Sequence, residues 1–114
     1  MGAEVEGFYS VYYTGVAGFG HSVLDITGGI VAGADATGGV YDGTYKLGEA
    51  GTVSIEVSLT VPAGATLVTG QTLQQSYSQT IKAELPANFA SGQHVPVQTP
   101  LGPVNAIFKK LRGM

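Results

Sequence analysis

Strict alternation of apolar and polar residues in two segments is the feature that most limits what this chain can fold into. Over residues 52–61 every odd-numbered position from Val53 to Val61 is apolar, and every even-numbered position is Thr, Ser or Glu. Residues 76–85 repeat the pattern, with Gln79 as the one polar exception on the apolar side. Because successive side chains of a strand point to opposite faces, this period of two predicts two strands with one buried and one wet face.

Six further segments are predicted as strands, because they are rich in aromatic and β-branched residues and lie between turns marked by glycine or proline. They are residues 7–14, 19–27, 30–36, 40–47, 92–99 and 104–111. The glycine-bracketed segment 48–51 is typical of a hairpin turn. Residues 62–75 are too long for a tight hairpin and contain an apolar patch, Leu67 and Val68, so a folded-over loop and a strand extension both stay open. Residues 85–91 could make a single helical turn around Asn88.

Eight consecutive short strands can form a sandwich or a barrel. Charged residues make up 11% of the chain, against roughly 25% in an average domain. An open sheet needs charges to protect its edges, whereas closure removes the edges, so the low charge favours a barrel. We therefore predict an all-β fold, an eight-stranded antiparallel up-and-down barrel of lipocalin-like shape, in which residues 1–114 form a single domain. Such a barrel is either filled by side chains or holds one small ligand, and the pattern leaves this open because it does not fix the pleat phase of the first three strands.

Residues that could carry catalysis are sparse. His21, Ser22 and Asp25 are close in sequence, but a strand would place Ser22 on the face opposite to the other two, which a catalytic triad does not allow. Asp35 and Asp42 flank a glycine turn, where aspartate commonly caps the backbone. The chain has no cysteine, its two histidines lack metal-ligand spacing, and its glycine-rich stretches are not followed by a helix that could meet a phosphate. We expect no catalytic, metal or cofactor site, and hence a protein that is not an enzyme.

The charge distribution limits the partners. The formal net charge is -3 with five Lys and Arg residues, so direct binding to nucleic acid is not expected. Lys109, Lys110 and Arg112 cluster near the C-terminus; they are too few for a membrane anchor, and we expect a solvated chain end. The first seven residues lack the features of a signal peptide, and no stretch approaches the roughly 20 apolar residues of a membrane helix. These observations predict a cytoplasmic protein with no membrane association.

Aromatic residues crowd the first half of the chain, and the first strand carries them on both faces. Because tyrosine combines a large apolar ring with a hydroxyl that needs a partner, it suits both cavity walls and subunit interfaces. Plain packing of these rings on cross-strand neighbours stays open as the alternative. The candidate residues are Tyr9, Tyr13, Tyr41 and Tyr45 for a ligand cavity, and Phe8 and Tyr12 for a dimer face.

A set of short motifs resembles the opening of the GrlR-like family of type III secretion negative regulators. The motifs are Gly7-Phe8-Tyr9, Gly18-Phe19-Gly20, the run from Gly29 to Asp35, and Tyr41-Asp42-Gly43-Thr44-Tyr45. The resemblance implies an eight-stranded lipocalin-like barrel, a homodimer, an apolar cavity, and regulation by binding a transcriptional activator protein rather than DNA. The founding member of that family holds its partner with an exposed acidic run, Glu-Asp-Glu-Asp. This chain has no such run, and its nearest loop offers only Glu49, so no partner-binding residues are transferred.

Two hypotheses follow. In the first, the chain is a non-enzymatic intracellular interaction protein, a homodimer that regulates transcription negatively by binding a regulator protein. In the second, it carries or senses a small apolar, lipid-like ligand in the barrel, with tyrosine hydroxyls orienting that ligand. Interior volume distinguishes them, because glycine and alanine at inward positions leave space that larger residues would fill.

Overall fold

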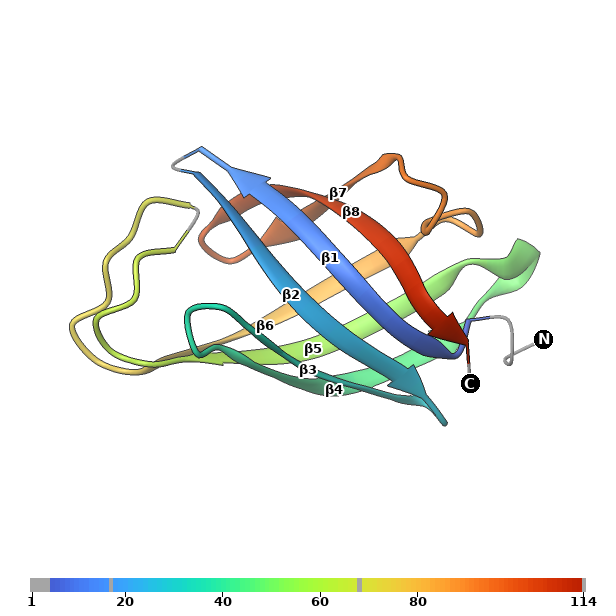
Figure 1. Ribbon diagram of the computed structural model, residues 1–114, viewed down its shortest axis with the longest axis horizontal. Coiled ribbons are helices and arrows are strands. Elements are labelled where there is room, and N and C mark those ends of the chain that lie inside the picture. The colour runs from blue at the N-terminus through green and yellow to red at the C-terminus, as the bar shows by residue number, and fades with distance from the viewer. Residues whose placement is uncertain (1–4, 17, 68, 114) are drawn as a thin grey trace.

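Eight antiparallel strands account for most of the chain in the computed structural model, which describes residues 5–16, 18–67 and 69–113 (Figure 1). The strands are β1 (Gly7–Gly15), β2 (Gly18–Thr27), β3 (Ile30–Asp35), β4 (Val40–Leu47), β5 (Val53–Val61), β6 (Tyr77–Leu85), β7 (His94–Thr99) and β8 (Gly102–Gly113). The predicted all-β fold is confirmed. No helix in the described parts of the chain is long and apolar enough to cross a membrane.

The strands form one sheet that curls into a nearly closed barrel. Its order is β6-β5-β4-β3-β2-β1-β8-β7, so chain neighbours pair as in an up-and-down barrel and β1 pairs with β8. The hydrogen-bonded sheet begins at β6 and ends at β7, and these two edge strands meet as a seam. Closure therefore removes fewer edges than the sequence argument expected. The short β7, with Pro96 in it, limits the exposed edge, since proline donates no hydrogen bond to a further strand.

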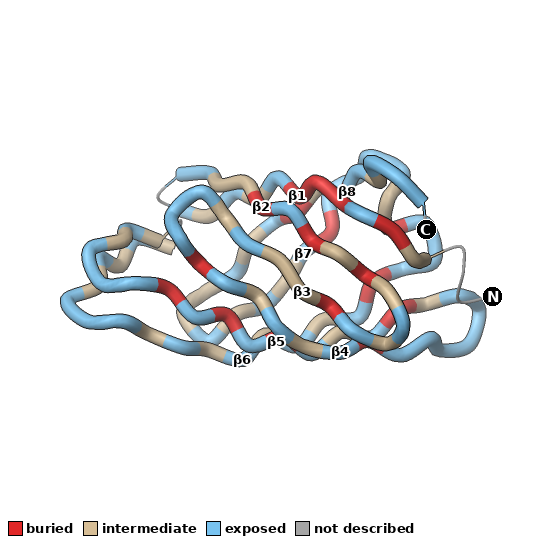
Figure 2. The backbone as a smooth tube through the Cα atoms, turned by 60° about the horizontal axis from the view of Figure 1, so that its bottom comes forward, coloured by how far each residue is buried: buried red, intermediate tan, exposed pale blue. Residues whose placement is uncertain are grey.

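The alternation in β5 and β6 places apolar side chains inside and polar side chains outside. Along both strands, positions alternate between buried or partly buried and exposed (Figure 2). Across the outer face, Thr60 Oγ1 and Ser78 Oγ are 2.9 Å apart, and Lys82 Nζ lies 3.9 Å from a carboxylate oxygen of Glu56. These exposed pairs add little to stability, so the buried face accounts for most of the stability of this pair of strands.

Two inward glycines allow the sheet to bend tightly. A Cβ atom on Gly33 would lie 2.1 Å from the carbonyl oxygen of Val23, and one on Gly43 would lie 2.1 Å from that of Glu56. Backbone of the neighbouring strand therefore occupies the space that a side chain would need. Glycine at such positions produces the strong coiling that a small barrel requires.

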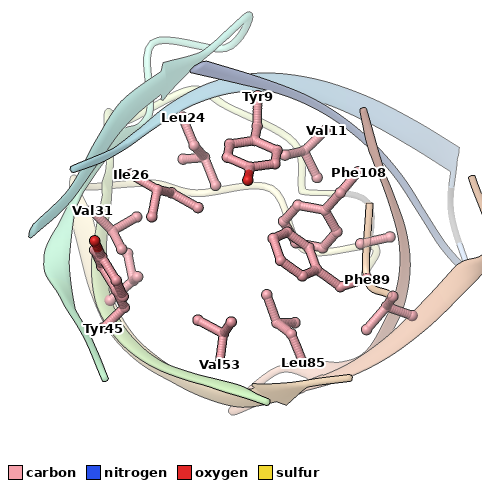
Figure 3. Close-up of a cluster of buried hydrophobic side chains, with 13 residues drawn as sticks. Tyr9, Val11, Leu24, Ile26, Val31, Tyr45, Val53, Leu85, Phe89 and Phe108 are labelled. Atoms are coloured by element: carbon pink, nitrogen blue, oxygen red, sulfur yellow. The ribbon is translucent and has the colours of Figure 1, made fainter. Parts of the chain in front are cut away.

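The hydrophobic core fills one end of the barrel, the end where the N-terminus and the β2–β3, β4–β5 and β6–β7 connections lie (Figures 1 and 3). Phe89, from the β6–β7 connection, is 3% exposed. Its ring centroid lies 5.5 Å from that of Tyr9 and 5.3 Å from that of Phe108. The other buried members, which come from all eight strands, are Val11, Leu24, Ile26, Val31, Tyr45, Val53, Val57, Leu85, Val95 and Ala106.

Three local details differ from the sequence analysis. The C-terminal strand, predicted to end at residue 111, runs to Gly113, and Arg112 pairs with Phe8. Residues 86–91 make consecutive turns, closed by Phe89 N–H to Pro86 O and Ser91 N–H to Asn88 O, both 3.0 Å, rather than a helical turn. A single 3₁₀ turn instead lies in the β4–β5 connection, at Glu49–Gly51.

Candidate functional site

The other end of the barrel contains a cavity of about 170 Å³. It lies where the β1–β2, β3–β4, β5–β6 and β7–β8 connections gather, opposite the packed core (Figure 1). Most of its wall is apolar, and a smaller set of polar side chains lies among the apolar ones. The apolar residues are Val11, Phe19, Leu24, Ile55, Val57, Leu59, Leu67, Ile81, Val97, Val104, Ala106 and Phe108; the others are Tyr13, Gly20, Ser22, Asp35, Thr37, Tyr41, Thr66, Thr69, Gln79 and Thr99.

The four tyrosines proposed for a cavity divide between the two ends of the barrel. Tyr13 and Tyr41 line the cavity. Tyr9 and Tyr45 lie in the packed core instead, with 1% and 8% of their surfaces exposed. They share the inward face with the first pair, but they lie at the end that Phe89 closes: the ring of Tyr9 lies against that of Phe89, and Tyr45 lies on the opposite wall beside Val31 and Val53 (Figure 3).

Asp35 organises the polar part of the cavity wall. Its Oδ1 accepts hydrogen bonds from Thr37 N–H (3.0 Å), Thr37 Oγ1 (2.7 Å) and Gly39 N–H (2.8 Å), so the aspartate caps the β3–β4 turn. Its Oδ2 accepts from the hydroxyls of Tyr41 (3.0 Å) and, more weakly, Tyr13 (3.4 Å). The carboxylate thus holds both tyrosine hydroxyls at the cavity wall while its own oxygens are well supplied with donors.

Burial keeps these tyrosines protonated. Desolvation, together with the neighbouring hydroxyl of Tyr13 and the carboxylate of Asp35, raises the pKa of Tyr41 far above its usual value. Desolvation likewise raises the pKa of Tyr13. Both phenols are therefore hydrogen-bond donors to Asp35 rather than anions under ordinary conditions.

A glycine makes room for the ring of Tyr13. Gly20 lies opposite Tyr13 in the β1–β2 register, and a Cβ atom on Gly20 would lie 2.5 Å from Cε2 of that ring. The aromatic ring thus covers the glycine from the neighbouring strand, which fixes Tyr13 at the cavity wall.

Gln79 is the least satisfied polar group in the wall. It follows Leu24, Gly33, Tyr41 and Leu59 in one register row that crosses the sheet from β2 to β6. Its Oε1 is buried and has no hydrogen-bond partner among the described residues. A buried acceptor without a donor is costly, so in solution this oxygen needs a donor from water or from a bound molecule.

The long β5–β6 connection contributes Thr66, Leu67 and Thr69 to the cavity wall. Thr66 and Thr72 form an isolated antiparallel bridge, and Leu67 N–H donates to Gln71 O at 2.8 Å. This segment is thus a folded-over loop, one of the two outcomes that the sequence left open. Leu67 lies in the cavity wall, whereas Val68, the other member of the predicted apolar patch, lies outside the described residues.

The outer surface of β1 and β2 carries exposed apolar residues. Phe8, Tyr12 and Val23 are 38%, 54% and 42% exposed. The imidazole of His21 packs on Tyr12 with 4.7 Å between ring centroids, and its Nε2 lies 2.6 Å from Ser10 Oγ. Phe8 and Tyr12 therefore point outward, on the face opposite to Tyr9 and Tyr13.

The Ser10–His21 pair has the spacing of a nucleophile and its base, but its surroundings do not suit catalysis. Ser10 is 6% exposed, so a substrate has little access to its hydroxyl. Among the described residues, no carboxylate bonds the other ring nitrogen of His21, and Asp25 instead accepts from Thr27 Oγ1 at 2.6 Å. Ser22 points inward while His21 and Asp25 point outward, as the strand geometry predicted. Within the described parts of the chain, no three potential metal ligands gather either.

The fold and cavity define a class: a small antiparallel β-barrel with a hollow at one end. Comparison with known proteins adds nothing to this class, since no protein-family model, no curated protein and no solved structure matches the chain.

Proposed function

We propose that this protein binds a small, largely apolar molecule at the hollow end of its barrel, as a carrier or sensor. The observation that supports this most is the cavity of about 170 Å³, which a domain of this size would fill with side chains if packing were its only requirement. Ligand sites are commonly apolar hollows with a few placed polar groups. Gln79 and the Asp35 cluster supply those groups here.

A pair of matched substitutions tests this proposal. Ala106 is 5% exposed and lies in the cavity wall, so Ala106→Leu places extra atoms in the hollow. Ala32 lies on the outer side of β3, and Ala32→Leu makes the same change away from the cavity. The proteins are purified from their own host and extracted, and mass spectrometry identifies the small molecules released. We expect one compound to accompany the original protein and Ala32→Leu but not Ala106→Leu; equal recovery from all three would contradict the proposal.

A second proposed function is protein binding through the outer surface of β1 and β2. The exposed aromatic side chains of Phe8 and Tyr12 support it, because aromatic residues are enriched at interfaces. We propose that this surface joins two copies of the chain. The role that the resemblance to the GrlR-like family implies, negative regulation in the cytoplasm by binding a transcriptional activator, belongs with this second proposal, and the net charge of -3 agrees with a protein rather than DNA as the partner.

Sedimentation of the original protein and of a double variant, Phe8→Ala with Tyr12→Ala, tests the dimer. The double variant should sediment as a monomer at concentrations where the original is dimeric. Val40→Ala is the control, since Val40 is also 54% exposed but lies on β4. A double variant that stays dimeric would show that another surface holds the copies together.

A further inference from the structure

We propose that the cavity selects a small neutral molecule with one N–H or O–H donor, which bonds Gln79 Oε1, and that it rejects apolar anions such as fatty acids. This inference rests on the proposed ligand-binding function and names the chemistry of its ligand. Three properties of the cavity lead to it: size, charge and unmet hydrogen-bonding capacity.

The size limits the ligand to about one or two rings. The cavity measures about 170 Å³. An apolar cavity of about 150 Å³ admits a molecule the size of benzene, whereas pockets for drug-sized ligands reach about 300–1,000 Å³. A single or fused ring therefore fits, and a long acyl chain does not fit within the hollow.

The charges in the wall disfavour an anion. Among the described lining residues, Asp35 alone has a formal charge at neutral pH, and no Lys, Arg or His side chain is present. A buried carboxylate without a cationic partner is costly, and the nearby carboxylate of Asp35 would repel it. The oxygens of Asp35 already accept hydrogen bonds from Thr37, Gly39, Tyr41 and Tyr13, so the hydrogen-bonding capacity of this carboxylate is met within the protein. The charges of the wall therefore favour a neutral ligand over an anion.

The unpaired acceptor on Gln79 determines that the ligand must offer a hydrogen-bond donor. The oxygen of Gln79 is buried without a donor among the described residues. Leu59 separates Gln79 from Tyr41 along the register row, so the donors of the Asp35 cluster are not adjacent to it. A ligand donor that reaches this oxygen completes a buried hydrogen bond, and a ligand without one leaves the acceptor unpaired.

Three bicyclic probes of nearly equal shape test the inference on the protein itself. Indole carries an N–H donor, benzofuran an ether oxygen and indene neither; indole-2-carboxylate adds an anion. Calorimetric titration should give indole the tightest binding, by about tenfold or more over benzofuran and indene, which is the factor that one buried hydrogen bond commonly contributes. Indole-2-carboxylate should not bind detectably.

A substitution separates the contact from general packing. Gln79→Met keeps the length of the side chain but removes the acceptor, so it should erase the preference for indole while indene binds as before. Because the variant no longer buries an unpaired oxygen, its thermal unfolding midpoint should not fall. Gln98→Met is the matched control, since Gln98 is exposed on β7 and should leave the preference unchanged.

The outcomes distinguish the two levels of the proposal. If benzofuran or indene binds the original protein as tightly as indole, or if Gln79→Met keeps the preference, the assigned contact is wrong although the cavity still binds ligands. Tight binding of the carboxylate would overturn the exclusion of anions. If no probe binds, this inference fails, and the mass-spectrometric comparison of the original protein with Ala106→Leu decides separately whether the cavity binds a ligand.

Discussion

Replacing Phe89 by alanine should cost this domain a large part of its stability. Phe89 is 3% exposed although it lies in a connection between strands, and its ring contacts those of Tyr9 and Phe108. Burying a phenylalanine side chain is worth about 1.5–3 kcal/mol, and each aromatic pair adds about 0.5–1.5 kcal/mol. We therefore expect the free energy of unfolding to fall by about 3–5 kcal/mol, the range usual for Phe→Ala in a core, out of a total of about 5–15 kcal/mol for an ordinary domain.

Urea unfolding followed by circular dichroism and tyrosine fluorescence measures this loss, since the chain contains no tryptophan. Phe19→Ala is the control: Phe19 is 82% exposed, so the same substitution should change the free energy of unfolding by no more than about 0.5 kcal/mol. A loss below about 1 kcal/mol for Phe89→Ala, or equal losses in both variants, would refute the idea that Phe89 closes the packed end of the barrel.

Three further predictions concern the sheet and the Asp35 cluster. Gly43→Ala should lower the free energy of unfolding in urea by about 1–3 kcal/mol, because the new Cβ atom meets a backbone carbonyl of β5; an unchanged value would contradict the close approach. Asp35→Ala should destabilise by about 1–3 kcal/mol and speed hydrogen exchange at Gly39 N–H, which loses its acceptor; protection equal to that of the original protein would argue against the cap. The pKa values of Tyr13 and Tyr41 are raised in the folded state. The two protonated phenols therefore contribute fully to the free energy of unfolding below about pH 10, the ordinary tyrosine pKa, and this contribution is lost as the pH rises further. Tyr41→Phe should flatten this alkaline loss in urea unfolding, and an equally steep fall in the variant would count against burial as its cause.

Strand positions follow from the sequence where alternation and turn residues agree. The predicted segment 40–47 is β4, and the predicted segment 52–61 begins one residue before β5. The predicted C-terminal strand, residues 104–111, is two residues too short at each end, because Pro103 was assigned to the preceding turn and the strand was ended before Arg112. The pairing of β8 with β1 ends at Asn105, so Pro103 pairs with β7 alone. Because no strand pairs with Pro103 on the β1 side, its missing N–H costs no hydrogen bond there. At the other end, pairing with β1 continues the strand through Arg112 to Gly113, although glycine has a weak strand propensity.

Which end of the barrel is hollow could not be predicted, because inward residues are apolar at both ends. Tyr9 and Tyr13 follow the same alternation, and they differ only in their distance along β1 from the end that Phe89 fills. Phe89 comes from a connection whose burial no periodicity reveals. Two signals were nonetheless present in the sequence: Gln79 interrupts an otherwise apolar inward series, and Asp35 precedes a glycine turn that it caps in the structure.

The residues of β1 that serve the two proposed functions lie on opposite faces of the strand, so ligand binding and dimer formation can be tested separately. In β1, Tyr13 points into the cavity, and its sequence neighbour Tyr12 is 54% exposed outside. Gln79 lies on β6, the far edge of the sheet from β1 in the strand order. Gln79→Met should therefore change ligand preference without changing sedimentation, because substitutions far apart and without shared contacts act independently. Conversely, Tyr12→Ala should weaken the association of two copies without changing the affinity for indole. If the substitution changed both sedimentation and indole affinity, the effect would have to pass through β1, where the outward Tyr12 and the inward Tyr13 are adjacent in the chain.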